Sequence, residues 1–262
     1  MDMGFYDLSK EDRKRLVERM RKAIRRDLDS GRVEGIRRLA SDKDTYVRKH
    51  AYLILGRLYR DDKELRERIL DVLRVLFGDE DVRVRQTAVY CLGEVGKIDA
   101  DRVLDMLEAA LSDEHHSVRN AVVGALKQMG EKNPKPALEF AGRFLHHPDP
   151  EIRRMIIHGV ELRGRTHPED ILPLLAELQS DPDRRVRRTV VHILGQISYK
   201  EGCLEKVVSE LKRWKNEKLV REALEEILDV HRRYEKFSDK SFREAKEYIE
   251  HQLGAGRAYP RD

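Results

Sequence analysis

The sequence predicts an all-α fold in which two-helix repeats follow one another and stack into a solenoid. Two observations lead to this prediction. Apolar residues recur at i, i+3, i+4 and i+7 in successive segments, which is typical of amphipathic helices. A dipeptide of Val or Ile followed by Arg also recurs six times in register, at Val47-Arg48, Val84-Arg85, Val118-Arg119, Ile152-Arg153, Val186-Arg187 and Val220-Arg221. The arginines are 37, 34, 34, 34 and 34 residues apart, a register that chance does not produce.

Each dipeptide lies in a similar local frame. An Asp stands five residues before the Val in four copies, at Asp42, Asp79, Asp113 and Asp181. The copy at Ile152-Arg153 is expected to shift its acid to Asp149. A helix precedes each of these turns and another follows it, so one repeat is a helix pair of about 34 residues. Because a single pair cannot bury its apolar face, only the stack is stable.

The composition is that of a charge-rich protein with a large surface in contact with water. Charged residues make up 39% of the 262 residues, against roughly 25% in an ordinary domain, yet the net charge is only +4. No apolar run reaches the ~18 to 20 residues that cross a bilayer, and no signal-peptide pattern opens the chain. With only two cysteines, a disulfide framework is excluded and a reducing compartment is expected. We therefore expect a cytoplasmic protein with no membrane partner.

The predicted organisation is a single solenoid over residues 1–253. It consists of an N-terminal cap or first repeat at 8–40, repeats at 41–235 and a C-terminal cap helix at 236–253, and a flexible tail follows at 254–262. Ser9 is the expected N-cap of a first helix, and Lys10 to Arg26 carry nine basic and three acidic residues, which suit a charged cap.

The repeated pattern of two helices, a turn with Asp and then Val-Arg resembles the HEAT-repeat family over residues 10–235. That resemblance implies a right-handed α-solenoid of about six to seven HEAT-like two-helix repeats, with the second helix of each pair on the concave side. It also implies a structural ladder in which the repeated Asp and Arg bond between neighbouring repeats. Its members here are Asp42, Arg48, Asp79, Arg85, Asp113, Arg119, Arg153, Asp181, Arg187 and Arg221.

Residues one, five and nine past each repeated Arg share one face of the second helix, because side chains four apart stack on a helix. We call this face, with its basic neighbours, the second-helix stripe. Its predicted nucleic-acid-binding or partner-binding members are Lys49, Arg57, Asn120, Arg154, His158, Arg163, Arg165, Arg188, His192, Gln196 and Lys200. Basic residues in one register suit a phosphate backbone, whereas the alternative is a merely solvated face.

Metal and cofactor sites are not predicted. His158 and His192 occupy equivalent positions in adjacent repeats and are expected to face each other, but as a metal pair they lack a third ligand at helical spacing. Phosphate-binding Gly-rich loops, Cys-x-x-Cys pairs and HExxH helices are absent from the sequence. We therefore expect no metal, no cofactor and no small-molecule substrate.

One segment has a narrower resemblance, to the HEAT-like alkylpurine DNA glycosylases of the DNA alkylation repair family. The residues that carry it are Ile152-Arg153-Arg154, His158-Gly159-Val160-Glu161, Leu172-Pro173-Leu174-Leu175, Val186-Arg187-Arg188, Gln196-Ile197-Ser198 and Trp214. The resemblance implies DNA held by its backbone on the concave face, and a carboxylate that supports loss of a damaged base. His158 and Gln196 stand where such acids would be expected, and an amide does not supply that charge. Glu161 and Glu94 are the remaining candidates.

The predicted function is a non-catalytic HEAT-repeat binding scaffold that uses its concave surface for a macromolecular partner. A protein partner ranks ahead of the backbone of duplex DNA, and an alkylpurine DNA glycosylase-like repair protein is the alternative. No catalytic residue is assigned.

Overall fold

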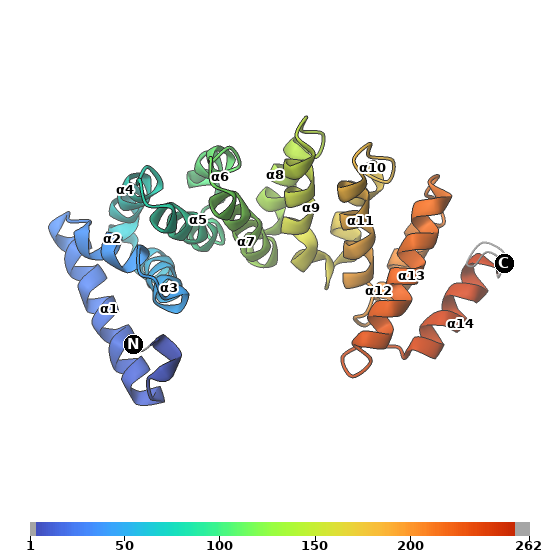
Figure 1. Ribbon diagram of the computed structural model, residues 1–262, viewed down its shortest axis with the longest axis horizontal. Coiled ribbons are helices and arrows are strands. Elements are labelled where there is room, and N and C mark those ends of the chain that lie inside the picture. Colours follow the sequence, from blue (N-terminus) through green and yellow to red (C-terminus); the bar gives the residue numbers. More distant parts are fainter. Residues whose placement is uncertain (1–3, 255–262) are drawn as a thin grey trace. The chain divides into compact units, whose positions relative to one another are not determined.

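The computed structural model describes residues 4–254, and this part of the chain is all-helical, as predicted. The described residues form fourteen α helices and three short 3-10 helices, with no β strand among them. They fall into two compact units, Met1–Asn133 and Pro134–Asp262. Within each unit, helix follows helix in the α-solenoid arrangement that the repeat spacing predicts (Figure 1).

The first unit is built from three helix pairs and a leading helix. Its helices are α1 (Lys10–Ser30), α2 (Glu34–Ala40), α3 (Thr45–Asp61), α4 (Arg66–Phe77), α5 (Val82–Gly96), α6 (Leu104–Ala110) and α7 (His116–Lys132), with 3-10 turns at Phe5–Asp7, Lys63–Leu65 and Ala100–Arg102. The second helices pack in series, α3 on α5 and α5 on α7. Helix α1 packs on α2 and α3 and buries Met20, Ile24 and Leu28.

The second unit repeats this plan and adds a closing helix. Its helices are α8 (Pro134–Phe144), α9 (Pro150–Gly164), α10 (Pro168–Glu177), α11 (Arg184–Gln196), α12 (Cys203–Leu211), α13 (Glu217–Arg233) and α14 (Phe242–Leu253). The second helices α9, α11 and α13 pack in series, and so do the first helices α8, α10 and α12. Helix α14 packs on α12 and α13.

Each second helix begins at a side chain that caps its free N–H groups. An Asp oxygen at Asp44, Asp81, Asp149 and Asp183 accepts the N–H two residues later. His115 does the same through Nδ1 in the third turn, and Asn216 caps α13. Such side chains satisfy donors that the helix itself leaves unbonded.

The repeated Asp of each turn has a separate role from this cap. A carboxylate oxygen of Asp42, Asp79, Asp113 or Asp181 accepts the N–H two residues later, at 2.7 to 2.9 Å. In the fourth turn, before Ile152-Arg153, the same bond is made by His147, whose Nδ1 accepts the N–H of Asp149 at 3.1 Å. The expectation that this copy shifts its acid to Asp149 is therefore wrong. Asp149 is the helix cap, and His147 occupies the position of the missing Asp.

Neighbouring second helices approach closely at a repeated glycine, eight residues past the repeated Arg. A Cβ added at Gly93 would lie 2.6 Å from the Cα of Ala125 on α7. A Cβ at Gly56 would lie 2.5 Å from the Cβ of Glu94, and one at Gly195 would lie 2.6 Å from the Cγ of Glu226. These positions therefore have no room for a larger residue.

Side-chain caps also mark the first and last helices. The Oγ of Ser9 accepts the N–H of Asp12 at 3.1 Å, which confirms Ser9 as the N-cap of α1. Ser241 and Glu244 form a reciprocal capping box at the start of α14. The predicted tail, apart from Gly254, lies outside the described residues, and the predicted repeat and cap boundaries stay predictions. None of the helices within residues 4–254 combines the length and apolar character that crossing a membrane requires.

Candidate functional site

Two of the repeated arginines join neighbouring repeats through buried ion pairs. The Nε of Arg85 donates to Oδ2 of Asp113 at 2.8 Å, and the Nε of Arg153 donates to Oδ2 of Asp181 at 2.7 Å. The side chains of both arginines are only 10% exposed. Because these groups are hidden from solvent, they serve the packing of each unit rather than a ligand.

Three further repeated arginines hold their own turns, as Arg85 and Arg153 also do. Nη1 of Arg48, Arg119 and Arg187 donates to the backbone carbonyl six residues earlier, at 2.6, 2.7 and 2.5 Å. The partner of Asp79 is Arg37 of α2, whose Nη2 donates to Oδ1 at 2.9 Å. The implied ladder is therefore not continuous within the first unit, since Arg48 is not the partner of Asp79.

The sixth copy departs furthest from the ladder. Arg221 is half-buried in α13, and its turn carries Lys215 at the position that Asp fills in four copies and His147 in one. Gln179 holds this turn instead, because its Oε1 accepts the N–H groups of Lys215 at 2.8 Å and Asn216 at 3.1 Å.

In the first unit the second-helix stripe is neutral along its centre. Lys49, Arg57 and Asn120 are exposed, as expected for a surface. The central position of the stripe on α5, five residues past Arg85, is Tyr90. Its ring stacks on that of Tyr52, with the two ring centroids 5.3 Å apart. A Cβ added at Gly124 would lie 2.7 Å from Cε1 of Tyr90, so this ring lies directly against the neighbouring helix.

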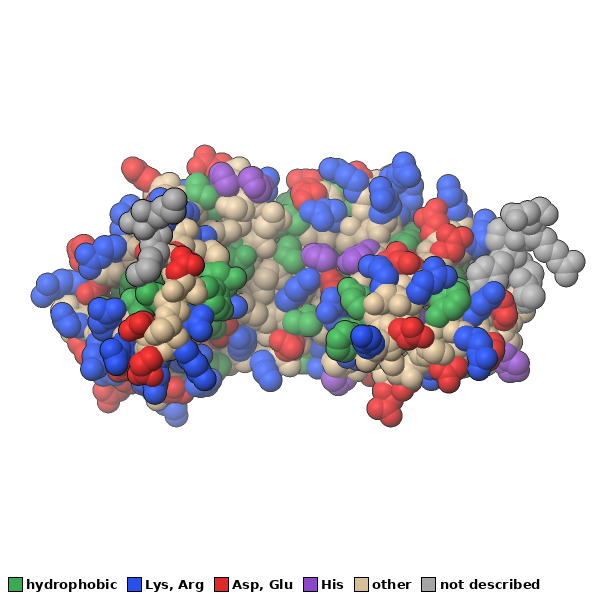
Figure 2. All heavy atoms as spheres, turned by 60° about the horizontal axis from the view of Figure 1, so that its bottom comes forward, with side chains coloured by type: hydrophobic (Ala, Val, Ile, Leu, Met, Phe, Trp, Pro, Cys, Tyr) green, Lys and Arg blue, Asp and Glu red, His purple; other side chains and the backbone are tan. Residues whose placement is uncertain are grey.

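In the second unit most stripe cations are paired with carboxylates. The Nε of Arg154 donates to Glu151 at 3.0 Å, and that of Arg163 donates to Asp170 at 2.7 Å. The Nε of Arg165, the residue just after α9, donates to Glu161 at 3.1 Å. Two further stripe cations, Arg188 and Lys200, are exposed, and the ammonium of Lys200 lies 4.9 Å from the ring centroid of Tyr199. Figure 2 shows basic and acidic side chains interspersed on the face that it draws of each unit.

One predicted stripe residue does not lie on the surface. Gln196 is only 4% exposed, and its Oε1 accepts a hydrogen bond from Nη2 of Arg165 at 3.2 Å. It is the last residue of α11, and there its side chain turns inward toward α9. Its place in an exposed binding stripe is therefore a wrong expectation, and its role is to position Arg165.

His158, Glu161 and His192 form a polar cluster between α9 and α11. Nδ1 of His158 lies 3.0 Å from Oε2 of Glu161, and the two imidazole centroids are 6.1 Å apart. One donor atom from each of the three residues lies within 4.8 Å of the others. The sequence reasoning that the His pair lacks a third ligand is therefore wrong, because Glu161 stands three residues after His158 on the same helix face.

A basic hollow that sequence reasoning missed lies at the amino ends of α11 and α13. It has a volume of about 650 Å³ and is lined by Arg184, Arg187, Arg188, Asn216, Lys218, Leu219 and Glu222. Of these, only the two residues Arg187 and Arg188 were predicted. The run of Arg184, Arg185, Arg187 and Arg188 in the sequence is the pattern that could have indicated it.

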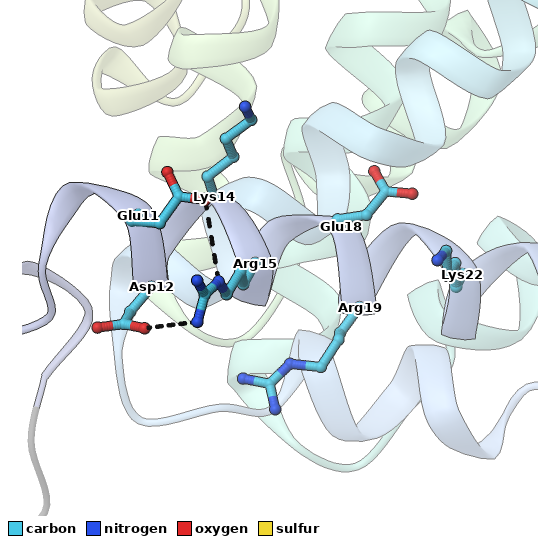
Figure 3. Close-up of a pocket in the computed structure, with 7 residues that line it drawn as sticks. All are labelled: Glu11, Asp12, Lys14, Arg15, Glu18, Arg19 and Lys22. Atoms are coloured by element: carbon cyan, nitrogen blue, oxygen red, sulfur yellow. Dashed lines mark ion pairs between the residues drawn. The ribbon is translucent and has the colours of Figure 1, made fainter.

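A second hollow, of about 590 Å³, runs along the outer face of α1. Figure 3 shows its lining residues, Glu11, Asp12, Lys14, Arg15, Glu18, Arg19 and Lys22, all on this one helix. Nε of Arg15 lies 3.8 Å from Oε1 of Glu11, and its Nη1 lies 3.9 Å from Oδ1 of Asp12. These distances are typical of loose surface ion pairs. This face is a solvated, mixed-sign helix surface rather than an enclosed ligand site.

The two acids considered for glycosylase chemistry are both engaged by neighbouring side chains, and Glu161 is buried whereas Glu94 is half-buried. The side chain of Glu161 is 2% exposed and lies between His158 and Arg165. The side chain of Glu94 is 12% exposed, and its Oε1 accepts from Lys97 at 2.7 Å. Each carboxylate is therefore already held by a basic side chain.

Comparison with known proteins agrees with this architecture. The chain matches a family model for HEAT repeats over residues 33–127, 71–143 and 138–229. It resembles the crystal structure of AlkD2 from Streptococcus mutans with a TM-score of 0.52 and 21% identity, over 87% of this chain and 99% of that one. For another structure, smu.31 from Streptococcus mutans, the TM-score is 0.48 and the sequence identity is 22%, over 66% of this chain and 96% of that one.

At 21% identity the likeness to AlkD2 concerns the fold alone, and no curated protein matches the sequence. The family matches, in contrast, cover most of the chain and coincide with the helix pairs α2–α3 to α12–α13. The chain therefore belongs to the HEAT-repeat family.

Proposed function

We propose that the chain is a non-catalytic binding scaffold that holds a protein partner along its second-helix stripe. The observation that carries this proposal is the pairing of stripe cations with carboxylates, at Arg154, Arg163 and Arg165. The neutral strip around Tyr90 in the first unit supports the same conclusion. Non-catalytic binding agrees with the pairing of Glu161 with Arg165 and of Glu94 with Lys97.

Each kind of partner requires a different surface. Tracking a phosphate backbone depends on cations that are free to displace the counterions of the nucleic acid. A cation already held by a carboxylate contributes little, because its pair must first be broken. Protein interfaces instead combine a desolvated centre, in which Tyr and Arg are enriched, with a polar rim of both signs.

The test is partner capture followed by measured affinity. The full chain is used as bait in an extract treated with nuclease at high salt, and the recovered protein is then purified and titrated by calorimetry. We expect the double variant Lys49→Glu/Asn120→Arg to weaken binding by about tenfold or more, because both side chains are exposed on the stripe.

The matched control is Lys135→Glu on the first helix α8, whose side chain is 86% exposed. It should bind the partner as the wild type does. A partner whose affinity is the same for the wild type and for the stripe variant would contradict the proposal, as would capture that disappears on nuclease treatment.

Duplex DNA is the second candidate, and the basic hollow at the amino ends of α11 and α13 favours it. Arg184, Arg187, Arg188 and Lys218 converge there, beside helix termini whose dipoles attract anions. The resemblance of residues 152–214 to the DNA alkylation repair family and the likeness in fold to AlkD2 point the same way.

The DNA proposal is tested by duplex affinity as a function of salt. If Arg188 and Lys218 each contact a phosphate, Arg188→Glu/Lys218→Glu should lower the slope of log affinity against log salt by about 2. Lys135→Glu/Lys236→Glu, with the same charge change at exposed positions of this unit, should leave the slope unchanged. Absence of binding at low salt, or equal slopes for the two variants, would remove DNA as a candidate.

A further inference from the structure

We propose that His158, Glu161 and His192 bind a divalent transition-metal ion, with Zn²⁺ as the best fit. This site lies wholly within the second unit, between the second helices α9 and α11. It is independent of the proposed protein or DNA partner, because it rests on ligand geometry rather than on the stripe as a surface.

The three side chains already converge from two elements. His158 and Glu161 lie on α9 three residues apart, which places them on one face, and His192 enters from the equivalent position on α11. One donor atom of each residue lies within 4.8 Å of the other two. The ligand atoms of a tetrahedral zinc site are about 3.5 Å apart, given Zn–N and Zn–O bonds of about 2.0 to 2.1 Å. Small side-chain rotations therefore suffice to close the site.

The donor set selects the kind of metal. Two imidazoles and one carboxylate are the protein ligands of open zinc sites and of non-haem iron centres. Mg²⁺ and Ca²⁺ prefer oxygen ligands throughout, so they are not expected to bind here. The side chains of His158 and His192 are 33% and 47% exposed, and hence a fourth coordination position would face solvent.

A second layer of contacts holds the buried ligand in place. Arg165 donates to Oε1 of Glu161 at 3.1 Å, whereas the other oxygen, Oε2, faces His158. Arg165 is itself positioned by Gln196 of α11, whose Oε1 accepts a hydrogen bond from Nη2 of Arg165 at 3.2 Å. Outer-layer contacts of this kind orient metal ligands and tune their affinity.

The same contacts affect how tightly the ion binds. The positive charge of Arg165 lies next to the carboxylate and opposes a cation, so we expect binding weaker than at a structural four-ligand zinc site. Glu226 on α13 lies 3.9 Å from Nδ1 of His192, close enough for a small rotation to form the carboxylate–histidine contact that supports metal-bound imidazoles. Binding would also connect two adjacent repeats, since its ligands come from both α9 and α11.

The test is titration of the purified full chain, without a polyhistidine tag, with Zn²⁺ and separately with Co²⁺. We expect saturable 1:1 binding by calorimetry, a rise in melting temperature with added Zn²⁺, and the visible absorption bands of four-coordinate Co²⁺. His192→Ala and His158→Ala should each weaken Zn²⁺ binding by about tenfold or more, because each removes one of three ligands.

His146→Ala is the matched control. His146 also pairs with a carboxylate, its Nε2 lying 2.7 Å from Glu177, but it lies on the surface away from the cluster. Its removal should leave Zn²⁺ affinity unchanged. Both cluster variants replace partly exposed side chains, and circular dichroism without metal verifies that they fold.

Three outcomes would overturn the proposal. They are no saturable Zn²⁺ binding by the folded wild type, wild-type affinity in both His158→Ala and His192→Ala, or an equal loss of affinity in His146→Ala. Because no partner is present in any of these measurements, their failure leaves the proposed scaffold function unaffected.

Discussion

At the scale of single residues, the repeated Asp stabilises its turn through several atoms at once. In the fifth repeat unit, Oδ1 of Asp181 accepts the N–H of Asp183, its carboxylate binds Arg153 of the preceding repeat, and its carbonyl accepts from Arg187. Asn has only one acceptor oxygen on its side chain, and Glu is too long for the two-residue bond. This combination explains why Asp is repeated at this position.

Removing this carboxylate should be costly. Asp181→Ala leaves the buried Arg153 guanidinium without its partner, which we expect to lower the free energy of unfolding by about 3 to 5 kcal/mol. Urea denaturation measures this change. Asp183→Asn, two residues away, should leave the denaturation midpoint nearly unchanged, because Asn also caps a helix and the ion pair of Asp183 is with the exposed Arg185. Equal effects of the two substitutions would contradict the proposed role of Asp181.

The sequence predicted which Asp and Arg residues repeat, but not every bond that they make. An arginine side chain reaches both the carbonyls of its own turn and the next carboxylate, so spacing alone does not select the partner. Arg48 and Arg85 share one register, yet only Arg85 reaches the following Asp. The burial of Gln196 was likewise hidden, because it depends on Arg165 of another helix.

At the scale of helices, the repeated glycine sets how closely neighbouring second helices pack. At Gly93 the obstacle to a side chain is the backbone of α7 itself, since the Cα of Ala125 would lie 2.6 Å from an added Cβ. A flexible side chain can move aside, but a helix backbone moves only with the helix.

Gly93→Ala is therefore expected to destabilise the first unit. The overpacking should cost about 1 to 3 kcal/mol, although alanine is the better helix former. Gly142→Ala on α8 is the matched control: nothing lies within 4 Å of its added Cβ, and it should raise stability by about 0.5 to 1 kcal/mol. Chemical denaturation of both variants gives the comparison. A Gly93→Ala protein as stable as the wild type would show that α5 and α7 can separate at no cost.

The candidate metal cluster also belongs to this scale, because it depends on which helix faces meet. Repeat spacing correctly places His158 and His192 on adjacent helices, and their rings are 6.1 Å apart. The acid at i+3, Glu161, was available in the sequence as a third ligand on the same face. What sequence could not supply is the inward rotation of its side chain, which burial and Arg165 determine.

At the scale of the whole molecule, many carboxylates are held ionised by their surroundings. The hydrogen bond from Arg37 lowers the pKa of Asp79 below its usual 3.8. Burial alone would raise the pKa of Asp113, but hydrogen bonds from Arg85 and from the N–H of His115 outweigh it and lower that pKa as well. The near balance of charge in this sequence thus reflects pairs of opposite sign, several of which join separate helices.

These lowered pKa values predict the response to acid. Because the folded-state pKa lies below the unfolded one, the stabilisation is fully present above about pH 5 and is lost as pH falls through the folded pKa. The stability of the wild type should therefore fall steeply below about pH 4. Asp79→Asn should be less stable at about pH 6, and its curve should meet that of the wild type at low pH. Denaturant titrations across this range measure both curves, and a constant gap at every pH would contradict the prediction.

The repeat class was predictable because it depends on local information. Apolar spacing, a turn with Asp and a fixed interval of 34 residues are each visible in the sequence, and they determine which faces must be buried. The partner surface was less predictable, because whether Arg154 or Arg188 is available to a ligand depends on nearby acids. Arg154 is held by Glu151, whereas Arg188 opens into the basic hollow.

The bond that closes the turn and the bond that caps the following second helix both come from residues of the turn itself, which affects how such a chain can change in evolution. In the turns at Asp79 and Asp181, the capping Asp, the turn-closing Asp and the arginine that grips the turn lie within seven residues of one another. A duplicated segment of about 34 residues would thus bring its own turn with it. New repeats can be gained by copying, after which the contacts between repeats, among them the glycine contact and the buried Asp–Arg pair, remain to be adjusted.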